Sequence, residues 1–218
     1  MVVINADKVQ SIYTKKARFY EWLFIDLIGW GRKLETFFRG SNYLRSNMKV
    51  MDAGCGTGIA TRILYNLTRE KNLQNITFHA FDLTPAMLDL FRKWMIKENM
   101  PDIELRQADV LRLDNLPSDW KEYDLVVSAG MLEYIAKHNL KNSLINLEAI
   151  MKNGATLLVF ISEQNLFMKW FVEKWWKANI FTKTEIQGVF QEAGFEKLRI
   201  MPLSTHWYNS TIVVEAKK

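Results

Sequence analysis

Residues 49–61 read Lys-Val-Met-Asp-Ala-Gly-Cys-Gly-Thr-Gly-Ile-Ala-Thr and combine a short apolar run with a glycine-rich turn. The apolar run ends at Asp52, and three alternating glycines follow: Gly54, Gly56 and Gly58. Glycine allows a sharp turn and lets a ligand approach the main chain closely. A dinucleotide fingerprint, G-x-G-x-x-G, has its third glycine one position later, where this chain has Ile59. The stretch therefore predicts a ligand-binding strand-to-helix turn and disfavours a nicotinamide-dependent oxidoreductase.

Strand-like and helix-like stretches alternate after residue 49, which is typical of a parallel sheet covered by helices. The strand candidates are residues 49–53, 76–82, 103–108, 123–129, 155–161, 196–202 and 210–216. Their short apolar runs are typical of strands that are buried on both faces. The short predicted loop 203–209 joins the last two strands, so we expect these strands to pair antiparallel.

Several helix and turn signals accompany the strands. Thr84-Pro85 predicts a helix that begins with an N-cap followed by proline. Thr182 and Glu185 have the spacing of a capping box, and Gly194 is typical of the end of the same helix. Asn153-Gly154 predicts a turn that leads into the fifth strand.

The composition indicates one α/β domain in a chain of 218 residues, of which 49% are hydrophobic and 24% charged. A single cysteine, Cys55, favours a reducing, cytoplasmic compartment, and we interpret it as a small filler in the turn. With three histidines it forms no visible metal-ligand cluster, so no metal is expected. The apolar run Trp22-Leu-Phe-Ile25 is far shorter than the about 20 residues that span a bilayer, and no secretory signal is expected.

The net charge of +5 lies wholly near the N-terminus. Residues 1–49 hold nine basic and four acidic residues, whereas the 20 basic and 20 acidic residues that follow cancel. Such asymmetry suggests either an anionic partner, such as a membrane surface, or a solvated helical face. Nucleic acid is not expected as a partner, because the balanced remainder offers no long basic track.

Two further acids follow predicted strands. Asp82 ends the second strand candidate, 24 residues beyond Gly58, where a carboxylate can accept from both hydroxyls of a ribose. A capping carboxylate before Pro85 is the alternative interpretation of Asp82. Asp109 follows the third strand candidate, and Val110 comes next. An adenine edge needs one acceptor and one donor, which a carboxylate and a backbone N–H supply, although Asp114 is a nearby competitor for this role.

Four motifs in order resemble those of class I S-adenosylmethionine-dependent methyltransferases. They are D-x-G-x-G-x-G from Asp52, Asp82-Leu-Thr-Pro-Ala-Met-Leu, Asp109-Val110, and Tyr123-Asp-Leu-Val-Val-Ser-Ala. The resemblance implies a Rossmann-like α/β fold over residues 47–218, with strand order 3-2-1-4-5-7-6 and only the seventh strand antiparallel. Residues 1–46 would form an added helical lid. It also implies that S-adenosylmethionine binds to Asp52, Gly54, Gly56, Gly58, Asp82, Leu83, Asp109, Val110, Ser128 and Ala129.

The resemblance extends to ubiquinone and menaquinone C-methyltransferases and bacterial phospholipid N-methyltransferases. It rests on the stretch Tyr13-Thr-Lys-Lys-Ala-Arg-Phe-Tyr-Glu-Trp-Leu-Phe24, in which Glu21 replaces the usual aspartate. Tyr13 and Tyr20 would close over the cofactor, with Tyr20 as a candidate catalytic residue. Glu133 and Tyr134 depart from the histidine pair of many relatives, so they receive no family role.

The sequence indicates the methyl acceptor less clearly than the cofactor. Residues 165–179 form an aromatic-rich stretch that is either a core helix or a wall for an apolar, lipid-like acceptor. His206 could take a proton from the acceptor, and Tyr208 is the other polar candidate, although a surface histidine is the ordinary interpretation. The alternatives are a polar metabolite as acceptor, or a protein that binds S-adenosylmethionine without catalysis. The oligomeric state and the methylated atom stay open.

Overall fold

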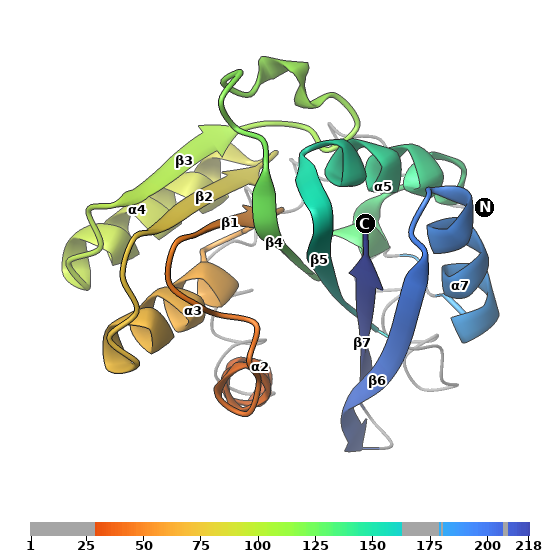
Figure 1. The fold of residues 1–218 in the computed structure, drawn as a ribbon, viewed down its shortest axis with the longest axis horizontal. Coiled ribbons are helices and arrows are strands. Elements are labelled where there is room, and N and C mark those ends of the chain that lie inside the picture. Colours follow the sequence, from red (N-terminus) through yellow and green to blue (C-terminus); the bar gives the residue numbers. More distant parts are fainter. Residues whose placement is uncertain (1–28, 163–178, 180, 207–208) are drawn as a thin grey trace.

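The computed structural model describes residues 29–162, 179, 181–206 and 209–218. Within them, seven strands form one sheet in the order β3-β2-β1-β4-β5-β7-β6 (Figure 1). The strands are β1 (Met48–Ala53), β2 (Ile76–Asp82), β3 (Ile103–Gln107), β4 (Tyr123–Ala129), β5 (Met151–Ser162), β6 (Lys197–His206) and β7 (Asn209–Lys217).

The sheet has the predicted topology. The neighbouring strands β3, β2, β1, β4 and β5 pair in parallel. Strand β7 pairs antiparallel with both β5 and β6, so β6 runs in the same direction as β5. The predicted order and the single antiparallel strand are both confirmed. The order reverses beside β1, and ligands in open α/β sheets bind at the carboxyl ends of strands near such a point.

Helices cover both faces of the sheet (Figure 1). One face carries α2 (Trp30–Arg39), α3 (Ile59–Glu70) and α4 (Pro85–Lys97), and the other carries α5 (Leu140–Ala149) and α7 (Lys183–Glu192). Short 3-10 turns lie at Leu113–Asn115, Leu132–Tyr134 and Lys137–Asn139. Leu34, Leu64 and Phe91 are fully buried in the first layer, and Leu144 and Phe190 are buried in the second. Both faces of the central strands are therefore buried, which accounts for their continuous apolar runs.

Two predicted boundaries are wrong. Strand β5 already begins at Met151, so Asn153-Gly154 lies within it rather than in a turn. Its pairing with β4 jumps from Tyr123–Met151 to Leu125–Thr156, and the extra β5 residues form an irregularity in which Gly154 has φ 76°. The predicted loop 203–209 shrinks to two positions, because β6 continues to His206 and β7 begins at Asn209. Backbone pairing extends these strands through polar residues, which carry no apolar signal.

The predicted helix signals are confirmed. The Thr182 hydroxyl accepts from the Glu185 N–H at 3.2 Å, and the Glu185 carboxylate accepts from the Thr182 N–H at 2.8 Å. Gly194 follows the end of α7 with φ 96°. Helix α4 begins after Thr84 with Pro85 as its first residue, but the Thr84 side chain makes no capping bond. There the loop is held by the Asp82 carboxylate, which accepts from the Thr84 N–H at 2.8 Å.

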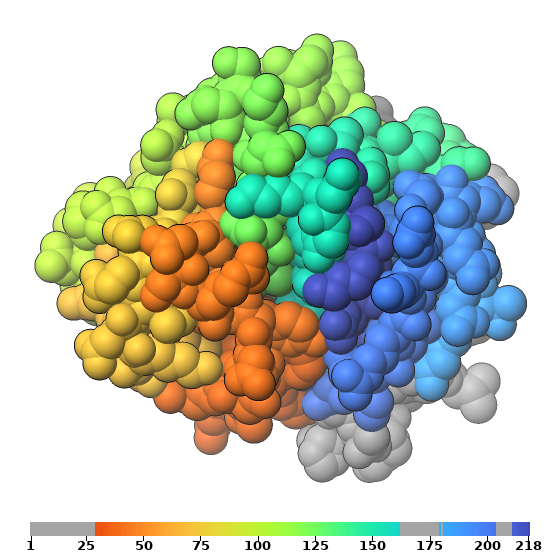
Figure 2. All heavy atoms as spheres, viewed as in Figure 1, coloured from red at the N-terminus to blue at the C-terminus, as the bar shows by residue number. Residues whose placement is uncertain are grey.

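The described part of the predicted lid packs on the sheet. Phe37 and Phe38 of α2 contact the ring of Phe160 at centroid distances of 5.3 and 5.6 Å. The Tyr43 hydroxyl donates to Glu215 of β7 at 2.9 Å. Figure 2 shows this segment, in orange, beside the blue C-terminal strands. Residues 1–28, which contain Tyr13 and Tyr20, lie outside the described residues. In the described part of the chain, no helix is both long enough and apolar enough to cross a membrane.

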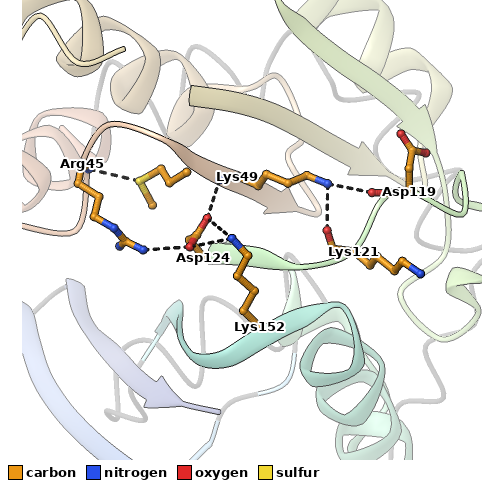
Figure 3. A network of polar contacts seen from close by, with 7 residues as sticks. Arg45, Lys49, Asp119, Lys121, Asp124 and Lys152 are labelled. Atoms are coloured by element: carbon orange, nitrogen blue, oxygen red, sulfur yellow. Dashed lines mark hydrogen bonds and ion pairs between the residues drawn. The ribbon is translucent and has the colours of Figure 1, made fainter. Parts of the chain in front are cut away.

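The amino edge of the sheet is held by Asp124 of β4 (Figure 3). Its nearly buried carboxylate accepts from the Lys49 N–H of β1 at 2.8 Å and from the Arg45 guanidinium at 2.9 Å. The Lys152 ammonium of β5 donates to both carboxylate oxygens at 3.1 and 3.2 Å. Asp124 thus joins three adjacent strands at the edge opposite to the one where a ligand is expected.

Candidate functional site

The glycine turn follows β1 and is fastened to β2. The N–H groups of Gly54 and Cys55 both donate to the Phe81 carbonyl at 2.9 Å, and the Gly58 N–H donates to the Cys55 carbonyl at 2.8 Å. Gly54, Gly56 and Gly58 have φ values of 70°, 54° and 84°, which side chains rarely tolerate. Cys55 is buried and burial raises the pKa of its thiol, which agrees with the filler interpretation. The turn is therefore fixed before any ligand arrives.

The three glycines serve two different purposes. A Cβ on Gly54 would lie 2.5 Å from the Met131 side chain, and one on Gly58 would lie 2.3 Å from the Phe91 ring. The chain's own side chains thus fill the space beside these two glycines. A Cβ on Gly56 would meet nothing within 4 Å. Gly56 is therefore the glycine that leaves room for a ligand beside the main chain.

Asp52 lies near the end of β1 and is only 2% exposed. Its Oδ2 accepts from the N–H of Thr61 at 3.1 Å and from the Thr61 hydroxyl at 2.6 Å. Its Oδ1 is buried and has no hydrogen-bond partner. Burial raises the pKa of Asp52 to about 6, against the lowering effect of the Thr61 donors, and nearby Asp82 adds to the rise. A buried carboxylate oxygen without a partner is costly, so it indicates a missing donor from a ligand.

Asp82 is the last residue of β2 and touches the glycine turn. Its Oδ2 accepts from the Gly56 N–H at 2.9 Å, and its Oδ1 accepts from the Thr84 N–H. Burial raises the pKa of Asp82, and hydrogen bonds from the Thr84 N–H, the Gly56 N–H and the Thr84 side chain partly offset the rise. Both interpretations of Asp82 therefore have support, because it orders the turn before α4 and keeps acceptor positions free for further donors.

Asp109 and Val110 lie just beyond β3. The Asp109 Oδ1 accepts from the Leu111 N–H at 2.9 Å, and the Arg112 N–H donates to the Asp109 carbonyl at 2.8 Å. The Ala108 N–H donates to the Asp82 carbonyl at 3.1 Å, which joins this turn to the end of β2. Val110 is buried and its carbonyl accepts from the Asn146 side chain. Asp114 lies in the following 3-10 turn, one step further along the chain.

Ser128 and Ala129 end the central strand β4. Ser128 is fully buried, and its hydroxyl has no hydrogen-bond partner. Gly130 follows with φ 75°, and its N–H donates to the Phe160 carbonyl at 3.0 Å. Asp52 lies on the adjacent strand, opposite Val127. Two unpaired polar oxygens, Asp52 Oδ1 and Ser128 Oγ, therefore lie on neighbouring strands close to the same edge.

The fold brings most of the predicted cofactor residues to one edge, at the carboxyl ends of the adjacent strands β3, β2, β1 and β4. Sequence reasoning missed Thr61 and Met131, because their partners Asp52 and Gly54 are identified only by tertiary contact. Backbone pairing places His206 at the end of β6, and Tyr208 lies outside the described residues. No group of three or more metal-ligating side chains occurs within the described residues.

Comparison with known proteins agrees with this geometry. Residues 50–154, which contain the glycine turn and the three acids, match the model of a family described as "Methyltransferase domain". Just under half of the chain thus matches a methyltransferase domain. A curated relative is the malonyl-[acyl-carrier protein] O-methyltransferase of Paenibacillus sp. (strain JDR-2), which is 26% identical over 132 residues. That match covers 60% of this chain and 45% of the relative, so the chain spans about half the relative's length.

Solved structures show the same methyltransferase fold. Magnesium protoporphyrin IX methyltransferase (ChlM) from Synechocystis PCC 6803, with bound S-adenosylmethionine, has a TM-score of 0.70 at 15% identity, and the match covers 100% of both chains. The [4+2]-cyclase SpnF has a TM-score of 0.75 at 13% identity, over 100% of this chain and 97% of that one. At these identities the likeness concerns the fold alone. The neighbours include a protein described as a cyclase, so the acceptor chemistry has to be argued from the site.

The residues of this methyltransferase domain fit S-adenosylmethionine. The unpaired Asp52 Oδ1 suits a donor of the charged amino-acid end, and Asp82 has acceptor positions for a ribose. The assignment of Asp109 and Val110 to the adenine edge stays a prediction, for which a carboxylate acceptor and a backbone N–H donor are the group types required. The open space beside Gly56 allows the cofactor to approach the main chain.

Proposed function

We propose that this protein transfers a methyl group from S-adenosylmethionine to a small apolar or lipid-like acceptor. The observation that carries the proposal is the buried Asp52 Oδ1, which lacks a partner at the edge where Asp82 and Ser128 also lie. When bound, S-adenosylmethionine supplies a methyl carbon already activated by a positive sulfonium. The protein's own task is then to orient the two reactants and to exclude water.

Two observations support an apolar acceptor. The Met131 side chain packs against Gly54 and so places an apolar group beside the cofactor turn. The aromatic stretch 165–179 follows β5, whose carboxyl end lies at the same edge; residues 165–178 of this stretch lie outside the described part. The curated relative is named for a malonyl group on an acyl-carrier protein, and because a malonyl group ends in a charged carboxylate, that name favours the alternative of a polar acceptor. His206 and Tyr20 remain the proposed catalytic residues, with His206 taking the acceptor's proton.

Calorimetric titration tests the cofactor part of the proposal. S-adenosylhomocysteine should bind, and NAD should not. Asp82→Ala should weaken binding about 10- to 100-fold, because each unpaired buried polar group costs about 1–3 kcal/mol. Asp102→Ala, at an exposed position just before the amino end of β3, is the matched control and should bind like the parent protein. Binding of NAD alone would overturn the proposal.

A labelled methyl donor tests the acceptor. Incubation with lipid extracts, quinone precursors and polar metabolites should place the label in the apolar fractions. Label found only in polar metabolites would favour the alternative function, a methyltransferase that acts on a polar metabolite. Binding of S-adenosylhomocysteine with no transfer to any fraction would favour a binding protein without catalysis, a reading that the cyclase among the neighbours keeps open.

The basic N-terminal segment supports a peripheral contact with anionic membranes. In the described residues, Arg39 pairs with Glu35 and Glu70, and Arg45 pairs with Asp124, so these cations are already neutralised. Residues 1–28 hold four basic and three acidic residues, so they contribute only +1 of the excess and residues 29–49 contribute the other +4. Each basic residue near an anionic surface contributes about 1 kcal/mol. Sedimentation with anionic vesicles should retain the protein, and charge reversal at Lys15, Lys16 and Arg18 should release it. Equal binding to neutral vesicles would refute the contact.

A further inference from the structure

We propose that Thr61 is a positioning residue for the cofactor, which it serves by holding one oxygen of Asp52 so that the other stays free for the ligand. This inference rests on the proposed function, since it concerns the same cofactor. No motif pointed to Thr61, because its role becomes visible only through its contact with the strand.

The contact between Thr61 and Asp52 is unusual because one carboxylate oxygen accepts both hydrogen bonds. Thr61 is the third residue of α3 and is fully buried. Its N–H and its hydroxyl both donate to Asp52 Oδ2, at 3.1 and 2.6 Å, and Oδ1 receives nothing. Two donors from a single residue fix the plane of the carboxylate. The empty oxygen is therefore held in one direction rather than turned to satisfy itself on the protein.

The surroundings of Asp52 make the Thr61 hydroxyl electrostatically important. Burial raises the pKa of Asp52 to about 6, and the Thr61 hydroxyl and N–H oppose that rise. Asp82 at the end of β2 raises it further, and the neighbouring Cys55 carries a neutral thiol. Thr61 thus favours the ionised form of Asp52. An ionised Asp52 attracts the cationic amine of the cofactor, whereas a protonated one attracts it far less.

Two substitutions separate the hydroxyl from the shape of the side chain. Thr61→Val keeps the branched shape and the backbone donor but removes the hydroxyl. The lost hydrogen bond is to a charged group, so its removal should raise the titration midpoint of Asp52 by about one pH unit or more. Thr61→Ser keeps the hydroxyl and should restore the parent behaviour.

The test follows S-adenosylhomocysteine binding by calorimetry between pH 5.5 and 8.5. If the midpoint rises by about one pH unit, Thr61→Val should bind about fivefold more weakly than the parent at pH 6 and within about twofold of it at pH 8.5. Thr61→Ser should follow the parent at every pH. A Thr61→Val curve that coincides with the parent, or one that is weaker by the same factor at all pH values, would overturn the proposal.

A second readout does not depend on the cofactor. The carboxyl carbon of Asp52, followed by nuclear magnetic resonance in the free protein, should titrate at a higher pH in Thr61→Val than in the parent and in Thr61→Ser. An unchanged titration midpoint of Asp52 would overturn the proposed role of Thr61, whichever ligand the protein binds. A raised midpoint in a protein that fails to bind S-adenosylhomocysteine would support the Thr61–Asp52 coupling and refute the proposed function instead.

Discussion

Gly58→Ala should destabilise the domain more than Gly56→Ala does, although the two glycines belong to one motif. Gly58 has φ 84°, and the left-handed region costs a residue with a side chain about 1–2 kcal/mol. The new Cβ would also lie 2.3–2.4 Å from three carbon atoms of the Phe91 ring. Phe91 is fully buried, so the ring has no solvent to move into.

The magnitude follows from these two contributions. Overpacking of a dense core costs about 1–3 kcal/mol, so Gly58→Ala should lower the free energy of unfolding by about 2–5 kcal/mol in total. Gly56 has φ 54° and nothing within 4 Å of its Cβ position, so Gly56→Ala should cost only the backbone contribution of about 1–2 kcal/mol. The difference between the two variants isolates the clash with Phe91.

Urea unfolding measures both stabilities, and titration with S-adenosylhomocysteine measures binding in the folded state. Gly56→Ala should lose more affinity than its small loss of stability explains, because its methyl group enters the space left for the ligand. The double variant Gly58→Ala, Phe91→Leu should lose less stability than the two single changes added together, because the smaller side chain relieves the clash. Equal stability of Gly56→Ala and Gly58→Ala, or additive costs in the double variant, would refute the reasoning.

Three other outcomes follow from the described contacts. Burial alone would raise the pKa of Asp124, but the hydrogen bonds from the Lys49 N–H and Lys152 outweigh burial, so the pKa of Asp124 is lowered. Asp124→Asn should therefore lower the free energy of unfolding by about 1–3 kcal/mol at pH 7, as measured by urea unfolding. The difference from the parent should shrink below about pH 4, where the carboxylate of the parent becomes protonated. Burial lowers the pKa of His79, which contacts the Tyr123 hydroxyl at 2.7 Å, so its ring resonances should titrate below pH 6.5; a midpoint above that value would contradict the packing. Thr182→Ala should lower stability by about 1 kcal/mol through loss of the capping box, and Thr182→Ser should not.

The sequence predicted those parts of the fold that depend on neighbouring residues. The capping box of α7 spans four residues, and the glycine turn is one short stretch, so both were recognisable from composition and spacing alone. The strand order came from the resemblance to a family rather than from periodicity. The ends of β5 and β6 were misjudged because backbone pairing with β4 and β7, not local apolar pattern, extends them.

In the candidate site, too, local sequence patterns were predictable and contacts between distant residues were not. Asp52, Asp82 and Asp109 stand out because acids at strand ends form a recognisable pattern. Which oxygen of Asp52 is free could not be predicted, since that depends on Thr61 reaching back from α3. The partners of Gly54 and Gly58 were equally hidden, because Met131 and Phe91 are distant in the sequence.

The glycine motif therefore records folding requirements as well as binding. Gly54 and Gly58 are required because side chains of the same chain occupy the space beside them, and Gly56 alone leaves that space open. The motif must persist wherever the turn is packed in this way, whatever reaction the protein carries out. Packing of this kind specifies the turn and not the reaction, so the chemistry has to be set by side chains elsewhere at the same edge of the sheet.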